Sequence, residues 1–170
     1  MIRDIVICAV QFIILVFCQV FILDNIYFLG FINPMLYVWF IIMLPFATPK
    51  WLVLVSSFVL GVCIDVFSAD IGINACVCVL IGFIRPALLN AFSGNIDNVT
   101  FQRPSVSSLG LKNYLPYMAL TVFIHHLLYF LIENFSFDEI LTTLLRIVLS
   151  SVVTIILILL SDMIFFKKNE

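Results

Sequence analysis

Charged residues are scarce in this chain. Lys, Arg, Asp and Glu make up 11% of its 170 residues, whereas hydrophobic residues make up 64%. A typical soluble domain has about 25% charged and about 45–50% apolar residues, and a domain of this size leaves much of its surface exposed. A water-soluble fold is therefore excluded. We expect residues 1–170 to form a single all-α, polytopic domain that is integral to a lipid bilayer.

Motifs of soluble enzymes and of nucleic-acid binders are also missing. The sequence has no Walker motif, no Gly-rich phosphate loop and no kinase signature. It has no basic face for a nucleic acid, and no nucleophile–base pair is visible. We therefore expect no catalytic activity, no cofactor and no nucleic-acid partner.

Histidine and cysteine lack the spacing of metal ligands. His125 and His126 are adjacent, so they lie about 100° apart on a helix and cannot both face one site. We expect one of them to be satisfied between helices and the other to lie at an edge. The five cysteines fall inside apolar runs, where a thiol packs as a small hydrophobe, with Cys76 and Cys78 on different helix faces. Neither set predicts a metal site or a disulfide.

The sequence consists mainly of apolar runs. A helix needs about 20 residues to cross about 30 Å of hydrocarbon. The runs predict six transmembrane helices, at roughly 5–23, 26 or 34–46, 51–67, 71–89, 114–132 and 137–166.

The second run is the least regular. Asn33-Pro34 looks like a helix start, with Asn as the cap and Pro at the first helical position. A helix that begins there would be short. Residues 26–33 would then enter the membrane as non-helical or separately helical backbone, which needs protein or water around it.

The basic residues predict the orientation, since Lys and Arg near helix ends favour the cytoplasmic side. Seven of the eight fall at alternate gaps or ends of the runs: Arg3, Lys50, Arg85, Arg103, Lys112, Lys167 and Lys168. The intervening gaps carry Asp24, Asp70, Asp138 and Glu139 instead. We expect both termini and residues 90–113 to be cytoplasmic. Arg146 is the exception.

Charged residues inside the predicted spans suggest two ion pairs. Asp65 and Arg146 both fall in the outer half of their spans, where a structural pair would neutralise both charges. A proton relay is the alternative, because intramembrane carboxylates mark such pathways. Arg85 and Asp162 fall near the inner ends, where they could pair or could each reach water.

Small residues line one face of the third run. Ser57 and Gly61 are four residues apart, a spacing that favours close helix packing in membranes. Asp65 continues the same face one turn further on. The pattern predicts that this helix is central to the bundle.

An ordered set of residues extends from 33 to 85. It consists of Asn33-Pro34, Pro45, Phe58-x-x-Gly61-x-x-x-Asp65, Gly72-x-Asn74-Ala75 and Arg85. This set, the chain length and the number of runs resemble the MreD family, the integral-membrane rod shape-determining proteins of bacteria. The resemblance and the charge argument together give the candidate structural or interaction residues Asn33, Pro34, Gly61, Asp65, Gly72, Asn74, Arg85 and Arg146.

The resemblance implies a non-enzymatic component of the cell-elongation (rod) complex in the bacterial inner membrane. Such a protein binds an MreC-like partner and is linked through it to MreB, RodA and a penicillin-binding protein, in cell-shape control and peptidoglycan synthesis. The family's fold is similar to the six-helix substrate-binding subunits of energy-coupling-factor transporters, so a small-solute-binding transporter subunit is the alternative. We expect the partner's helix to cover the outer half of the Asn33–Tyr37 region, where irregular backbone needs protein around it.

Overall fold

The computed structural model describes residues 2–25, 32–68, 72–93, 103–134 and 140–166. In these ranges the regular elements are helices. They are α1 (Ile2–Cys18), the π-helical turn η1 (Gln19–Leu23), α2 (Val38–Ile42), α3 (Lys50–Ser68), α4 (Ile73–Ser93), α5 (Val106–Leu109), α6 (Leu111–Glu133) and α7 (Ile140–Phe166).

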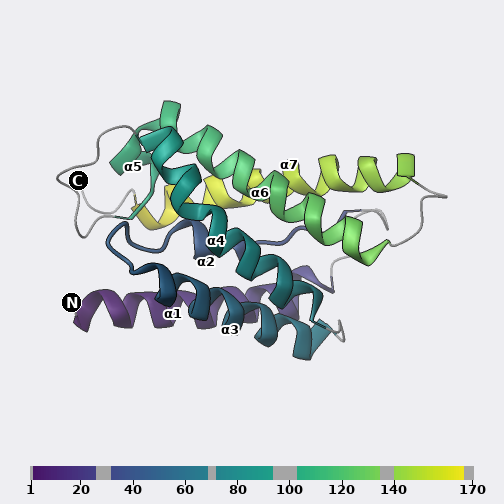
Figure 1. Cartoon of the computed structure of the whole chain (residues 1–170), viewed down its shortest axis with the longest axis horizontal. Helices are drawn as coiled ribbons and strands as arrows, with labels where there is room; N and C mark the ends of the chain where they lie inside the picture. Colours follow the sequence, from purple (N-terminus) through teal and green to yellow (C-terminus); the bar gives the residue numbers. More distant parts are fainter. Residues whose placement is uncertain (1, 26–31, 69–71, 94–102, 135–139, 167–170) are drawn as a thin grey trace.

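Five helices of the described residues are long and apolar enough to cross a membrane. They are α1 with η1 (Ile5–Leu23), α3, α4, α6 and α7. In Figure 1 these helices lie side by side along the long axis, and the start of α1 and the end of α7 lie at the same end of the bundle. The chain is therefore a multi-pass helical membrane protein.

The second predicted span differs from the expectation, because no long helix forms there. Residues 32–46, which we call the broken crossing, return from one end of the bundle to the other between η1 and α3 (Figure 1). Their only helix is the five-residue α2, which begins at Val38, so the predicted start at Asn33-Pro34 is wrong. The alternative, a short helix preceded by non-helical backbone, is confirmed for residues 32 and 33, whereas residues 26–31 lie outside the described part.

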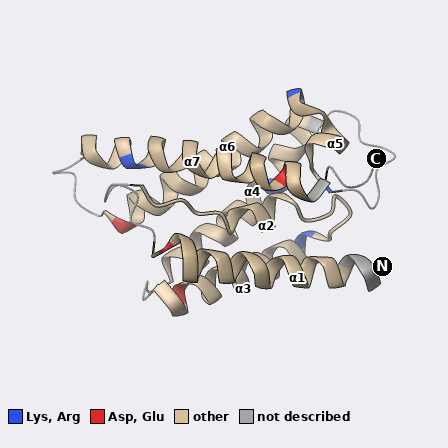
Figure 2. Cartoon of the chain, turned by 180° about the vertical axis from the view of Figure 1, so that it is seen from behind, with Lys and Arg blue, Asp and Glu red and all other residues tan. Residues whose placement is uncertain are grey.

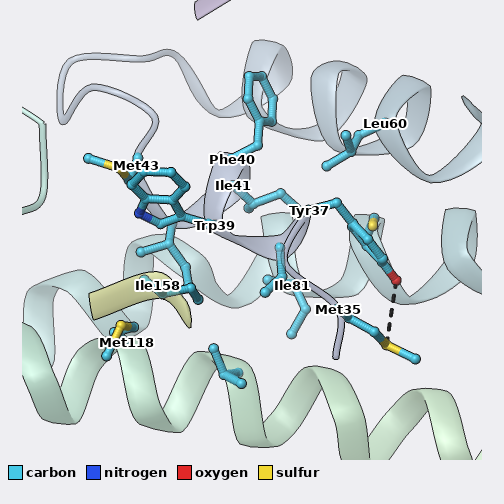
Figure 3. Close-up of a cluster of buried hydrophobic side chains, with 14 of the residues drawn as sticks. Met35, Tyr37, Trp39, Phe40, Ile41, Met43, Leu60, Ile81, Met118 and Ile158 are labelled. Carbon is cyan, nitrogen blue, oxygen red and sulfur yellow. Dashed lines mark hydrogen bonds between the residues drawn. The ribbon is translucent and has the colours of Figure 1, made fainter. Parts of the chain in front are cut away.

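The broken crossing forms the centre of the hydrophobic core. All five residues of α2 are buried. Figure 3 shows Trp39, Phe40 and Ile41 in one cluster with Leu60 of α3, Ile81 of α4, Met118 of α6 and Ile158 of α7. A segment this short cannot contribute a full set of helical hydrogen bonds. Surrounding helices must therefore supply the remaining partners of its backbone.

The long helices expose apolar side chains on their outward faces. Ile13 and Phe17 on α1 are 65% and 57% exposed, and Leu141 on α7 is 72% exposed. Exposure of this kind is costly in water, but it matches lipid, which is as apolar as leucine. The outward faces thus fit the membrane assignment.

Helices α3 and α4 approach closely where the small residues predict it. A Cβ atom on Gly61 would lie 2.4 Å from the Cα of Ala75, and one on Gly82 would lie 2.7 Å from the Oγ of Ser57. The predicted close packing is confirmed. The predicted central place is wrong, since the opposite face of α3 exposes Phe58.

Candidate functional site

The backbone of the broken crossing is held by side chains from two neighbouring helices. The amide of Asn33 donates to the Oγ of Ser150 at 3.0 Å, and that of Met35 donates to the Oγ1 of Thr154 at 3.1 Å. The amide of Leu36 donates to the Oε1 of Gln19 at 2.8 Å. Non-helical backbone at membrane depth requires such partners, because lipid supplies none. Helix α7 and the turn η1 therefore replace the missing helical hydrogen bonds.

Gln19 uses both ends of its side-chain amide in this role. Its Nε2 donates to the carbonyl of Pro34 at 3.0 Å and to the Oδ1 of Asp24 at 2.7 Å. The residue is buried, at 1% exposure, and is the first residue of the π-helical turn η1. π-Helical turns within α-helices are rare and often occur at functional sites. Sequence reasoning missed Gln19, although an amide side chain inside an apolar run, which Gln11 also provides, was the available signal.

The C-terminal end of α2 is held in the same way by α4 and α6. A guanidinium nitrogen of Arg85 donates to the carbonyl of Leu44, and the hydroxyl of Tyr117 donates to the carbonyl of Ile42 at 3.2 Å. Carbonyl groups at a helix end have no helical partner of their own. Tyr117 satisfies one of them, and Arg85 satisfies the carbonyl of Leu44 in the non-helical backbone that follows α2.

Arg85 does not behave as either sequence hypothesis expected. It is 2% exposed, so it does not reach water, and it forms no ion pair with Asp162. Asp162 instead accepts a hydrogen bond from the amide of Val106, at the start of α5, at 3.1 Å. Both predictions for Arg85 are wrong because the non-helical backbone after α2 offers the carbonyl of Leu44 as an acceptor, which sequence could not place.

Asp65 binds the first turn of α4. Its carboxylate accepts from the amide of Asn74 at 2.9 Å, from the Nδ2 of Asn74 at 3.0 Å and from the amide of Ala75 at 2.9 Å. A carboxylate is stabilised at a helix N-terminus, where amide groups lack helical acceptors. Gly72 directly precedes this turn with a φ of 77°, a value that favours glycine.

The predicted ion pair between Asp65 and Arg146 is wrong. Arg146 instead approaches Glu133 at 3.8 Å and lies over the ring of Phe130, 4.9 Å from its centroid. The physical reason is proximity, since the amide donors of α4 lie only nine residues beyond Asp65 in a helical hairpin.

The two histidines occupy the interior beside the broken crossing. His126 Nδ1 lies 2.9 Å from the carbonyl of Val122, which can only accept, so Nδ1 donates and Nε2 accepts from the hydroxyl of Thr154 at 3.2 Å. One histidine is thus satisfied between helices, as predicted. His125 is wholly buried against the ring of Tyr37, so its predicted edge position is wrong.

The site as a whole is a polar frame around an apolar segment. Tyr37 donates to the Oδ1 of Asn74 at 2.6 Å, which joins the crossing to the Asp65 cap on α4. In the described ranges, no three His, Cys, Asp or Glu side chains lie together as metal ligands would. All five cysteines are free thiols, and Cys76 is exposed whereas Cys78 is buried, as predicted for different faces. The arrangement is suited to positioning backbone.

Seven of the eight predicted residues belong to this frame or to the α3–α4 contact beside it. They are Asn33, Pro34, Gly61, Asp65, Gly72, Asn74 and Arg85. Arg146 lies apart from them. The side chains that sequence reasoning missed are Gln19, Tyr37, Tyr117, Ser150 and Thr154.

The protein itself covers the region expected to seek a partner. Met35 and Tyr37 are 2% and 1% exposed, and Ser150, Thr154 and Gln19 supply the hydrogen-bond partners. The reason for placing a partner's helix on Asn33–Tyr37 therefore no longer applies.

Similarity to known proteins adds no further constraint. The chain matches no family model, no curated protein and no solved structure.

Proposed function

We propose that this protein is a non-enzymatic component of a bacterial cell-elongation complex, of the kind that MreD represents. It binds an MreC-like partner in the inner membrane and contributes through it to cell-shape control and peptidoglycan synthesis. Its links to MreB, RodA and a penicillin-binding protein are indirect.

One observation supports the proposal most directly. The residues that resemble MreD are spread over more than fifty positions. Apart from Phe58, which is exposed on the opposite face of α3, the candidate residues among them gather around the broken crossing and the adjoining α3–α4 contact. Tyr37 and Asn74 connect the two parts at 2.6 Å. A motif that forms one spatial unit supports the resemblance better than scattered residues would.

The proposed topology has six crossings, of which the second is the broken crossing, with both termini in the cytoplasm. The basic residues support it. Helices α3 and α6, whose first turns carry Lys50 and Lys112, begin at the end where α1 begins (Figure 1). Helix α6 ends with Glu133 at the opposite end, where Asp24 follows η1. Figure 2 shows the basic and acidic residues in colour. Positive charge favours the cytoplasmic side.

The partner contact is proposed to be a helix–helix contact along α1. Among the described side chains of α1 and η1, only Leu15 and Gln19 are buried, so most of this helix is available. A single partner helix could pack there without displacing any contact of the bundle. Helix association in lipid depends on close packing and polar contacts rather than on a hydrophobic driving force.

Purification in mild detergent, followed by identification of the co-purifying chains, tests the function. Recovery of an MreC-like protein is the expected result. Recovery of an ATPase pair with a coupling subunit, and no MreC-like protein, would favour the small-solute-binding transporter subunit.

Site-specific photo-crosslinking tests the surface separately. A photoreactive residue at position 13 of α1, which is 65% exposed, should capture the MreC-like partner. The matched control is position 141 of α7, which is 72% exposed and should capture it much less. Equal capture at both positions would place the contact elsewhere.

A further inference from the structure

Arg146 is placed unlike the other basic residues. Among the described residues, it is the one Lys or Arg at the bundle end that carries Asp24, Asp65 and Glu133, as the single blue segment at that end of α7 shows (Figure 2). Positive charge is disfavoured on the side opposite the basic residues. Its presence there calls for a specific partner.

The contacts of Arg146 with the described residues leave its hydrogen-bonding capacity unused. The nearest carboxylate oxygen, on Glu133, lies 3.8 Å away, which is beyond hydrogen-bond length. Its Nε has no hydrogen-bond partner, and Phe130 contributes only a ring face at 4.9 Å. Guanidinium has five N–H donors. None of them makes a hydrogen bond to a residue that the structure describes.

The side chain is nevertheless open to the outside of the bundle. Arg146 and Glu133 are 27% and 32% exposed. The Nδ2 of Asn134 donates to the Oγ1 of Thr143 at 3.0 Å, which ties the end of α6 to the start of α7 next to this pair. The partly exposed side chain of Arg146 therefore lies beside a connection between α6 and α7 that a hydrogen bond stabilises, although its Nε is buried.

The depth of Arg146 places it near the lipid headgroups. Helix α7 has 27 residues, a length of about 40 Å, so it exceeds the hydrocarbon by about 10 Å. If the excess length is divided equally between the two ends, each end extends about 5 Å beyond the hydrocarbon. Arg146 is six residues from the start of α7, so it lies about 4 Å inside the hydrocarbon boundary. A long arginine side chain can extend that far toward the interface.

We propose that Arg146 binds the phosphate group of a membrane phospholipid in the leaflet at this end of the bundle. Phosphate offers paired oxygens that match the guanidinium fork. In this site the phosphate binds beside the guanidinium, on the side where the Glu133 carboxylate lies 3.8 Å away. The acyl chains lie along the exposed leucines of α7. The site does not depend on the proposed function, because it needs only the membrane and the residues named.

Binding of phosphatidylglycerol to the full-length purified protein, measured by native mass spectrometry in detergent, tests the site. Arg146→Gln should weaken the first binding step by about tenfold, the effect of losing about 1.4 kcal/mol. Arg146→Lys should retain part of the affinity, since ammonium keeps the charge without the fork. Glu133→Gln should strengthen binding, because it removes the competing carboxylate. Unchanged thermal stability of each variant shows that the fold is kept.

Two controls distinguish binding at this site from nonspecific electrostatic attraction between the anionic lipid and basic side chains. Lys50→Gln removes one charge at the opposite end, and it should leave the first binding step unchanged. Equal loss in Lys50→Gln and Arg146→Gln would overturn the proposal, and so would full competition by inorganic phosphate at matched concentration. Displacement of the lipid by a co-purified partner chain that contacts Arg146 would also overturn it.

Discussion

The hydroxyl of Tyr37 donates a 2.6 Å hydrogen bond to the Oδ1 of Asn74, whose Nδ2 donates in turn to Asp65. This link joins the broken crossing to the first turn of α4 and the end of α3. It explains how a segment with a single five-residue helix keeps a fixed position inside a bundle of long helices. The stability of the fold therefore depends on these polar contacts.

Asp65 should be the most sensitive of these residues. Asp65→Ala leaves the amides of Asn74 and Ala75 unpaired in the interior, and we expect it to lower the free energy of unfolding by about 3 kcal/mol. Asp65→Asn keeps an acceptor and should cost less. Denaturant unfolding in detergent measures both. An Asp65→Arg, Arg146→Asp exchange should not restore stability, and restoration would show that the two residues interact after all.

Gln19 should contribute more to the free energy of unfolding than its position in an apolar helix indicates. Gln19→Leu matches the apolar composition of the helix, but it leaves the amide of Leu36 and the carbonyl of Pro34 without the partner that Gln19 provides. We expect a loss of about 2–4 kcal/mol, from one to two unsatisfied buried groups. The matched control is Ile13→Leu on the exposed face of α1, which should be neutral. A Gln19→Leu protein as stable as the control would mean that the broken crossing does not need this support.

The glycines of α3 and α4 should differ in their tolerance of alanine. In Gly61→Ala the new Cβ meets backbone at 2.4 Å, whereas in Gly82→Ala it meets the Ser57 side chain at 2.7 Å. Backbone cannot yield as a side chain can, so Gly61→Ala should be the more destabilising, by about 1–3 kcal/mol as for other overpacked sites. Gly72→Ala meets no atom within 4 Å, and its positive φ should cost about 1 kcal/mol. Thermal unfolding of the three variants gives the order.

Much of the fold was predictable because it follows from hydropathy and helix length. The runs at 5–23, 51–67, 71–89 and 114–132 all correspond to long helices, since only a helix satisfies its own backbone in lipid. The broken crossing was predictable only as an alternative, because its backbone partners are spread over η1, α4, α6 and α7, and those on α7 lie more than a hundred residues away.

Several residues of the candidate site were predictable from the sequence, but their hydrogen-bond and ion-pair partners were not. Gly61, Asp65 and Asn74 were chosen from one motif, and they do lie together. Charge sign alone then matched Asp65 with Arg146, whereas an uncharged helix N-terminus was the nearer partner. Hydrogen-bond partners of backbone groups leave almost no trace in a sequence, which is why Gln19 and Thr154 were missed.

Membrane orientation is the last expectation that a simple measurement can decide. The proposed topology predicts that positions 29 and 136 face outside, but both lie outside the described residues. Lys112, the second residue of α6, and Asn134, its C-cap, are described and lie at opposite ends of that helix. In a chain whose native cysteines are replaced, Asn134→Cys should react with an impermeant maleimide added outside the cell. Lys112→Cys should react only after the membrane is opened, because basic ends stay in the cytoplasm. The reverse pattern would invert the topology, and reaction of both positions from one side would mean that α6 does not cross the membrane.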